Sequence, residues 1–156
     1  MRLSKRLAAV AEQIRPGVRV ADIGTDHARL PVWLVRNNMV SAAIAVDIAD
    51  GPLAVAREYI KRCGLSGRIT VIRSDGLSAL DLTQIDDIII AGMGGETIAE
   101  ILEQGLPRID GKRLILQPMS RPERLKARLM SAGIQIISEQ IIEEGRRKYT
   151  LFLAQK

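Results

Sequence analysis

The chain has 156 residues, which is the size of one domain and enough to bury a substantial core. It has 23 Lys and Arg against 18 Asp and Glu, and the resulting net charge of +5 favours binding to a polyanion. Only 3% of its residues are aromatic, so it has few side chains on which bases could stack. It has no signal-peptide-like segment, no apolar run of about 18 residues and a single cysteine, Cys63, so we expect a cytoplasmic protein with no membrane contact.

The first expected element is an amphipathic helix over residues 3–14. Its apolar residues recur at helical spacing, Ser4 fits the N-cap, and Pro16-Gly17 ends the helix. A β-branched run over residues 18–23 then predicts a strand that ends in a turn at Gly24. The chain therefore begins with a helix placed ahead of its first strand.

The rest of the chain alternates apolar runs with helical patterns. Because strands that alternate with helices imply parallel crossovers, and the last two strands follow each other directly, we predict an α/β fold with a seven-stranded, mostly parallel sheet and a C-terminal antiparallel hairpin. This matches the Rossmann-like class I methyltransferase architecture, with the N-terminal helix added, in a single domain over residues 1–156. The later strands are expected at 42–46, 69–72, 87–91, 114–116, 135–142 and 148–154, and the helices at 28–37, 50–63, 96–104 and 121–132.

The turn after the first strand indicates a cationic ligand. Gly24 lets the backbone turn sharply and lets a ligand approach closely. The turn lacks the G-x-G-x-x-G pattern of dinucleotide sites, and its glycine lies between Asp22 and Asp26. Carboxylates repel a pyrophosphate and attract a cation, so S-adenosylmethionine, with its sulfonium and ammonium groups, suits this turn better. An ordinary βα turn is the alternative interpretation.

Other strand ends carry residues suited to a nucleoside, because ligands of doubly wound sheets collect beyond the carboxyl ends of the strands. Asp47 is placed to take both ribose hydroxyls, with a turn or helix-capping role as the alternative. Asp75 can accept from an adenine amino group while the N–H of Gly76 or Leu77 meets a ring nitrogen, or it forms a plain Asp-Gly turn. The predicted cofactor contacts are Asp22, Gly24, Asp47, Ile48, Asp75, Gly76, Leu77 and Gly92, and no metal is expected.

The loop Gly92-Met-Gly-Gly95 and the single histidine are further candidates. The glycines permit close approach of a substrate base or of a reactive methyl group, and Met93 can pack on a flat ring, although a loop that needs positive φ angles would look the same. His27 follows the turn directly, where a hydrogen-bonded helix-start residue is the alternative to proton transfer.

Several segments together resemble the bacterial tRNA (adenine-22-N1)-methyltransferase family across essentially the whole chain. They are Leu3-Ser-Lys-Arg-Leu7, Ala21-Asp-Ile-Gly-Thr-Asp-His-Ala28, Gly51-Pro52, Ser74-Asp-Gly-Leu77, Ala91-Gly-Met-Gly-Gly95 and Leu114-Ile-Leu-Gln-Pro118. The resemblance implies S-adenosylmethionine as methyl donor, S-adenosylhomocysteine as product and a tRNA adenine as acceptor. It implies cofactor contacts at the strand-end carboxylates and glycines, and places the Gly92–Gly95 loop beside the reacting groups.

The chain departs from the family pattern at two points. Family members usually continue into a C-terminal helical domain, which we expect to be absent because this sequence stops at Lys156. The family also tends to have Asn after Gln-Pro, where this chain has Met119. An amide donor near the target base is therefore expected to be missing.

Methylation of adenine N1 needs no prior deprotonation, because that nitrogen already bears an in-plane lone pair. Catalysis is then expected to rest mostly on alignment in a site that excludes water. Asp26 is the candidate for stabilising the new positive charge or for holding the adenine amino group, and Gln117 for orienting the base edge. His27 would shape the pocket, and Met93 would line it.

Phosphate contacts would supply most of the RNA binding. Solvated helix faces or a hairpin turn are the alternative interpretation of the same cations. Two other functions fit the sequence: methyl transfer to a small molecule or protein, and a non-catalytic nucleoside-binding module that regulates a partner. The candidate tRNA contacts are Arg2, Lys5, Arg6, Arg121, Arg124, Arg128 and Arg146.

Overall fold

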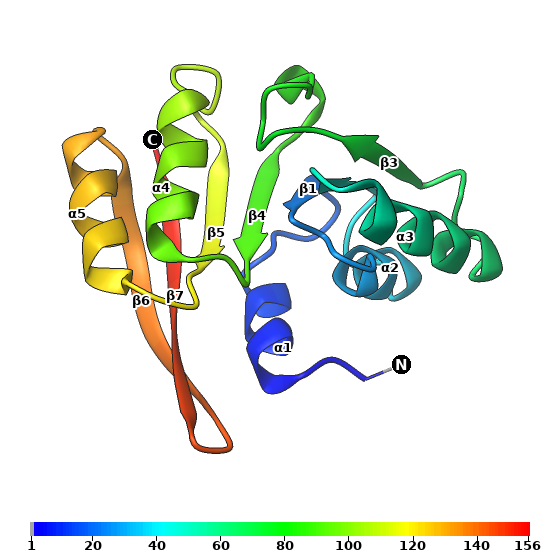
Figure 1. Cartoon of the computed structure of the whole chain (residues 1–156), viewed down its shortest axis with the longest axis horizontal. Helices are drawn as coiled ribbons and strands as arrows, with labels where there is room; N and C mark the ends of the chain where they lie inside the picture. Colours follow the sequence, from blue (N-terminus) through cyan, green and yellow to red (C-terminus); the bar gives the residue numbers. More distant parts are fainter. Residues whose placement is uncertain (1) are drawn as a thin grey trace.

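In the computed structural model, which describes residues 2–156, seven strands form one sheet in the order β3-β2-β1-β4-β5-β7-β6 (Figure 1). The first five strands run parallel, and β7 pairs antiparallel with both β5 and β6. The predicted α/β fold with a C-terminal antiparallel hairpin is confirmed. The strands are β1 (Arg19–Ile23), β2 (Ala42–Asp47), β3 (Ile69–Arg73), β4 (Asp87–Ala91), β5 (Arg113–Gln117), β6 (Gln135–Glu144) and β7 (Arg147–Gln155).

Within residues 2–156, five α-helices cover the two faces of the sheet. Buried side chains of α1, α2 and α3 contribute to the core on one face, and those of α4 and α5 contribute to the core on the other. Figure 1 shows α4 and α5 in front of β5, β6 and β7. The helices are α1 (Lys5–Glu12), α2 (Arg29–Arg36), α3 (Asp50–Arg62), α4 (Gly95–Gln104) and α5 (Pro122–Ser131).

The central strand β4 is apolar because both of its faces are buried. Ile88 and Ile90 pack into the core beneath α4 and α5, whereas Ile89 packs into the core beneath α1 and α2. All three side chains are fully buried. A strand covered on both faces cannot alternate apolar and polar residues, so the continuous run is the expected pattern.

The connection from β3 to β4 departs from the predicted alternation of strands with helices. It contains only a short 3₁₀ turn, η1 (Leu82–Gln84), which begins where the Asp81 carboxylate accepts a hydrogen bond from the Thr83 N–H at 3.1 Å. Leu77, Leu80 and Leu82 are buried along this segment. An irregular apolar segment therefore covers the sheet where a helix would otherwise pack.

Helix α1 is held at the carboxyl edge of the sheet by contacts with distant parts of the chain. It spans Lys5–Glu12, within the predicted residues 3–14, and Ser4 is its N-cap as predicted, accepting from the Leu7 N–H at 3.2 Å. The Glu144 carboxylate accepts from the Lys5 N–H at 2.9 Å and from the Arg6 N–H at 3.4 Å. The β6–β7 hairpin, which carries Glu144, thus reaches past the sheet to the start of α1 (Figure 1).

Within the described part of the chain, no helix has the length and apolar character needed to span a membrane.

Candidate active site

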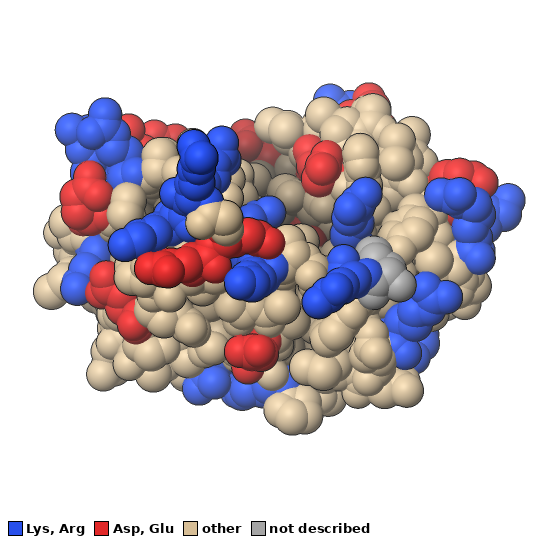
Figure 2. Space-filling view, turned by 90° about the horizontal axis from the view of Figure 1, so that it is seen from below, with Lys and Arg blue, Asp and Glu red and all other residues tan. Residues whose placement is uncertain are grey.

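The predicted strand-end residues gather along one edge of the sheet. The carboxyl ends of the parallel strands β1 to β5 lie side by side there, beside α1. Figure 2 looks onto this edge and shows a surface hollowed near its centre, with acidic and basic side chains around the hollow.

Two pockets meet at Gly24, which lines both. One pocket has a volume of about 310 Å³ and is lined by Asp47, Ile48, Asp75, Gly76 and Met93 among others; we name it the nucleoside-side pocket after the contacts that the sequence predicts there. The other has a volume of about 400 Å³ and is lined by Arg6, Asp22, Asp26, His27, Arg29 and Ala91 among others; we name it the acceptor-side pocket in the same way. Gly24 has a φ of +73°, and a Cβ there would collide with the Met93 methyl group. The positive φ favours glycine at this turn, and the approach of a ligand to it stays a prediction.

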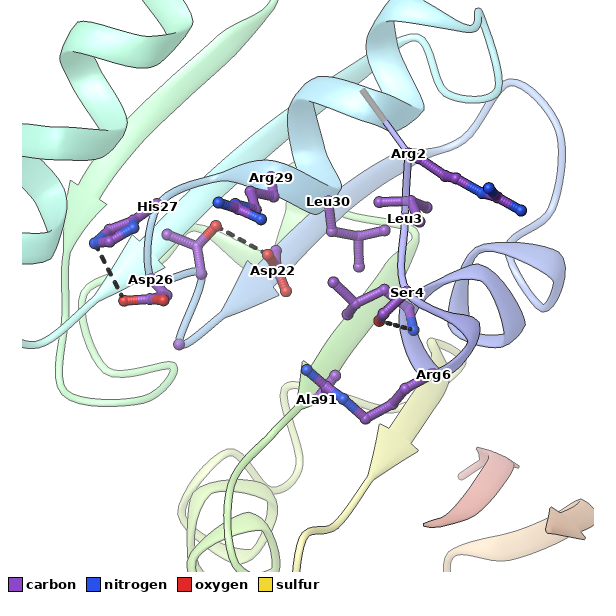
Figure 3. A pocket seen from close by; sticks show the side chains of 13 residues that line it. Arg2, Leu3, Ser4, Arg6, Asp22, Asp26, His27, Arg29, Leu30 and Ala91 are labelled. Carbon is purple, nitrogen blue, oxygen red and sulfur yellow. Dashed lines mark hydrogen bonds and ion pairs between the residues drawn. The ribbon is translucent and has the colours of Figure 1, made fainter. Parts of the chain in front are cut away.

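The turn between β1 and α2 is unusually bent, because Asp26 and Ala28 also have positive φ angles, of 57° and 61°. The turn is fixed by the Thr25 N–H, which donates to the Val46 carbonyl at 2.8 Å, and by the Ala28 N–H, which donates to the Thr25 carbonyl at 3.1 Å. Helix α2 consequently begins at Arg29, one residue later than predicted. The bend leaves the Asp26 and His27 side chains exposed at the mouth of the acceptor-side pocket (Figure 3).

Asp47 ends β2 with its carboxylate already oriented by backbone donors. One oxygen accepts from the N–H groups of Ile48 at 2.8 Å and Ala49 at 3.2 Å, and the other accepts from the Asp26 N–H at 3.2 Å. Each carboxylate oxygen can accept more than one hydrogen bond. The carboxylate is therefore held in place and keeps acceptor capacity toward the nucleoside-side pocket.

The turn after β3 places Asp75 and Gly76 in the nucleoside-side pocket. Gly76 has a φ of +56°, and a Cβ there would lie 3.2 Å from the Ile101 side chain. The Ser74 hydroxyl donates to the Gly76 carbonyl at 2.8 Å and accepts from the Ala79 N–H at 3.0 Å, which fixes the turn. The Leu77 side chain is buried in the core, so only its backbone is available to a ligand.

Asp22 is the one carboxylate buried within the acceptor-side pocket. Its oxygen accepts a hydrogen bond from the Thr25 hydroxyl at 2.9 Å, and its residue is 5% exposed. Burial raises the pKa of Asp22 to about 7, against the opposing effect of the Thr25 hydrogen bond. The nearby Asp47 charge raises this pKa further, and Arg6 lowers it. A cationic group in the pocket would favour the ionised form.

Asp26 and His27 lie side by side at the pocket mouth. The His27 Nε2 lies 3.6 Å from an Asp26 carboxylate oxygen, and their side chains are 47% and 74% exposed. Figure 3 shows both at the end of the pocket that lies away from Arg6. Both can therefore reach a ligand that enters from solvent.

The fold and this geometry can be compared with known proteins. A family model described as "Methyltransferase domain" matches residues 3–152. The tRNA (adenine(22)-N(1))-methyltransferase of Bacillus subtilis is 43% identical over 156 residues, covering 99% of this chain and 66% of the relative. The chain belongs to the tRNA (adenine-22-N1)-methyltransferase family. It spans about two thirds of the length of that curated relative.

Solved structures of family members agree closely with this one. The B. subtilis tRNA methyltransferase TrmK has a TM-score of 0.94 at 42% identity, over 99% of this chain and 66% of that one. Streptococcus pneumoniae Sp1610, solved with S-adenosyl-L-methionine, has a TM-score of 0.94 at 40% identity, over 99% and 73% of the two chains. Mycoplasma capricolum TrmK, solved with S-adenosyl-homocysteine, has a TM-score of 0.88 at 35% identity, over 100% and 70%.

The Gly92–Gly95 loop of this methyltransferase family member packs against the loop that follows β5. Gly92 has a φ of +93° and lines neither pocket. The Met93 carbonyl accepts from the Met119 N–H at 2.7 Å, and the Gly95 N–H donates to the Ser120 carbonyl at 2.8 Å. A Cβ at Gly95 would lie 2.7 Å from that carbonyl oxygen. At Gly95, backbone of the neighbouring loop occupies the space that the sequence suggested for a ligand.

Gln117 is fully buried, with both ends of its amide in use. Its Oε1 accepts from an Arg6 guanidinium nitrogen at 2.6 Å, and its Nε2 donates to the Pro118 carbonyl at 2.8 Å. The Arg6 guanidinium also lies 5.9 Å from the centre of the Tyr149 ring. Gln117 therefore acts on the acceptor-side pocket through Arg6 in this structure.

The cations predicted to bind RNA fall into two groups. Arg124 pairs with Glu96 at 2.6 Å, and Arg128 pairs with Glu103. These ion pairs join α5 to α4, so both arginines have a structural use. Arg2 and Arg6 line the acceptor-side pocket, and Arg121 and Arg146 are exposed on loops. Sequence reasoning missed Arg29, because a single arginine at a helix start carries no signal of its own.

Proposed function

We propose that this chain transfers the methyl group of S-adenosylmethionine to N1 of an adenine in tRNA, position 22 by family membership, and releases S-adenosylhomocysteine. The observation that carries the proposal is the pair of pockets that meet at Gly24, one lined by the carboxylates of Asp47 and Asp75 and the other by those of Asp22 and Asp26. The family relationship supports the acceptor, and the ligand-bound relatives support the cofactor.

The nucleoside-side pocket has the donors and acceptors that the cofactor needs. Asp47 would take the ribose hydroxyls beside Ile48, and Asp75 would accept from the adenine amino group. The backbone of Gly76 and Leu77 would meet the adenine ring. Gly92 would shape the Gly92–Gly95 loop beside the cofactor. Across the junction at Gly24, Asp22 of the acceptor-side pocket would face the cofactor's ammonium group, because its buried carboxylate has no Lys or Arg partner among the ion pairs of residues 2–156.

When bound, S-adenosylmethionine supplies an electrophilic methyl group on a cationic sulfur. The chain's own residues then position the acceptor. Asp26 would offset the positive charge that N1 methylation leaves on the base, or hold the adenine amino group. Met93 would line the junction of the two pockets, His27 would shape the entrance, and Gln117 would keep Arg6 over the pocket or orient the base edge.

The tRNA would be held largely through its phosphates. Arg2, Lys5 and Arg6 would contact it from α1 and the segment before it, and Arg121 and Arg146 would contact it from exposed loops. Arg124 and Arg128 would first have to exchange their carboxylate partners for phosphates, so we expect them to contribute less.

The test is incubation with labelled S-adenosylmethionine and unmodified bacterial tRNA, followed by nucleoside analysis. We expect label in 1-methyladenosine. Label found only in small molecules or protein, or tight cofactor binding without transfer, would overturn the proposal. Asp26→Asn is the matched variant, because Asn tolerates the left-handed φ of 57° at this position. It should lower turnover by about tenfold to hundredfold while cofactor affinity is retained.

A further inference from the structure

A second depression adjoins the acceptor-side pocket on the surface between α2 and α3. It has a volume of about 320 Å³ and is lined by His27, Arg29, Val55, Tyr59 and Arg62, which we call the α2–α3 groove. Val55, Tyr59 and Arg62 repeat at helical spacing, so they share one face of α3. His27 and Arg29 line both the groove and the acceptor-side pocket, so the two adjoin at these side chains.

The groove is basic, and its arginines are available. Within residues 2–156, none of the ion pairs includes Arg29 or Arg62. Arg62 lies over the Tyr59 ring, with 5.9 Å between the guanidinium carbon and the ring centre. That contact holds the guanidinium beside the groove at little cost to its hydrogen-bonding capacity, because a cation–π contact leaves the N–H donors free.

The groove also offers apolar surface between its cations. Val55 is 46% exposed and lines the groove between the arginines. Guanidinium groups match the geometry of phosphates, and apolar surface beside them suits the sugar that joins two phosphates. A sugar–phosphate chain is therefore the ligand whose chemistry fits the whole groove.

The position of the groove relative to the acceptor-side pocket gives it a role. Figure 3 shows His27 and Arg29 toward the end of that pocket opposite Arg6. A nucleotide chain whose adenine enters the acceptor-side pocket must leave it again, and the groove adjoins that pocket at the side chains of His27 and Arg29. The groove is therefore placed to meet nucleotides that neighbour the target adenosine.

We propose that the α2–α3 groove binds the tRNA backbone next to the target adenosine, with Arg29 and Arg62 at its phosphates. This rests on the proposed function and adds a surface that the sequence did not indicate. Tyr59 positions Arg62, and Val55 contacts the sugar. The groove fixes the register of the RNA strand, so its loss weakens tRNA binding without touching the cofactor.

The experiment compares Arg62→Glu with Arg57→Glu in the full chain. Arg57 lies on the same helix, is exposed and does not line the groove, so the two variants change the net charge equally. We expect Arg62→Glu to raise the KM for tRNA by about tenfold or more and to make the salt dependence of tRNA binding shallower by about one phosphate contact. The kcat at saturating tRNA and the affinity for S-adenosylmethionine should stay at the wild-type values.

Arg57→Glu should raise the KM for tRNA by less than about twofold, because loss of one distant exposed charge is screened by salt. Arg62→Lys should recover part of the affinity, since it keeps the charge and loses the fork geometry. If Arg62→Glu and Arg57→Glu raised the KM for tRNA equally, or if neither raised it, the groove would not be a tRNA-binding surface. The proposed function would then remain intact. Wild-type protein that neither binds nor methylates tRNA would overturn the proposed function itself.

Discussion

The two pockets beside Gly24 are built in different ways. The nucleoside-side pocket is made largely from turns that follow β2 and β3, and its defining contacts are local, such as those between the Asp47 carboxylate and the next two N–H groups. The acceptor-side pocket is roofed by α1, and α1 is held there by Glu144 and Gln117, more than 100 residues further along the chain. One pocket is specified by short sequences, the other by the assembled fold.

This difference has a consequence for function. A pocket made from tight turns at strand ends is fixed as soon as the sheet forms, which suits a cofactor of constant shape. A pocket roofed by the first turn of a helix that three hydrogen bonds attach can respond to a larger substrate, because local attachments of that kind open at low cost. Substitutions in the nucleoside-side pocket should therefore lower cofactor affinity strongly. Substitutions that loosen α1 over the acceptor-side pocket should have smaller effects on tRNA binding.

The largest effect is expected at Asp47. Asp47→Ala removes the proposed ribose acceptor and the partner of the Ile48, Ala49 and Asp26 N–H groups. Hydrogen bonds to a charged group are worth about 1.5–3 kcal/mol each, so cofactor affinity should fall about hundredfold by calorimetry.

Asp50→Ala is the control, because Asp50 begins α3 just after Asp47 but pairs with Arg73 in solvent. Its cofactor affinity should match that of the wild type. Equal affinities for the two variants would mean that the nucleoside-side pocket does not hold the ribose, and the contrast between the pockets would lose its basis.

A smaller effect, dependent on pH, is expected at Asp22. The pKa of this buried carboxyl is raised to about 7, and a cofactor ammonium binds its ionised form. Affinity should therefore decrease as pH falls below 7, by up to about tenfold per pH unit. Titrations from pH 7.5 to pH 5.5 would show this slope, and Asp22→Asn should bind weakly with a flatter profile.

Without cofactor, Asp22 makes the free energy of unfolding change with pH in the direction opposite to that expected for cofactor affinity. A carboxyl whose pKa rises on folding binds more protons in the folded state, so it lowers the free energy of unfolding as pH rises from about 4 toward 7. Urea unfolding of the wild type should show this decline relative to Asp22→Asn. Parallel pH profiles for the two proteins would contradict the burial of an ionisable group at this position.

The sequence was most informative where structure is local. The turn at Asp22–Asp26 and the strand-end residues Asp47 and Asp75 could be placed because apolar periodicity locates the strands and parallel strands bring their ends together. The sheet and its hairpin followed from the same pattern.

Contacts between distant segments could not be read from the sequence. The sequence did not show that Arg6 is hydrogen-bonded to Gln117 inside the pocket or that Arg124 pairs with Glu96, and the contacts of both arginines with RNA stay predictions. The basic run in α5 is visible in the sequence and suggested an RNA-binding surface. The α2–α3 groove is lined by single arginines from two helices, Arg29 and Arg62, which are far apart in the sequence. Only packing decides which carboxylate lies near which arginine.

The smallest effect is expected at the roof of the acceptor-side pocket. Glu144→Gln keeps the shape of the side chain but weakens its hydrogen bonds to the Lys5 and Arg6 N–H groups, which act as a cap on α1. Loss of a cap costs about 1 kcal/mol, so the free energy of unfolding in urea should fall by at most that amount. The KM for tRNA should rise a few-fold, with the affinity for cofactor unchanged.

Glu143→Gln is the neighbouring control, since Glu143 makes only an exposed ion pair with Lys148 at 3.6 Å. Exposed pairs contribute little, so this variant should keep wild-type stability and KM within error. If Glu144→Gln instead weakened cofactor binding as strongly as Asp47→Ala, the roof and the nucleoside-side pocket would form one cooperative unit. The division of the active site at Gly24 would then have to be abandoned, because α1 would hold the cofactor rather than the acceptor.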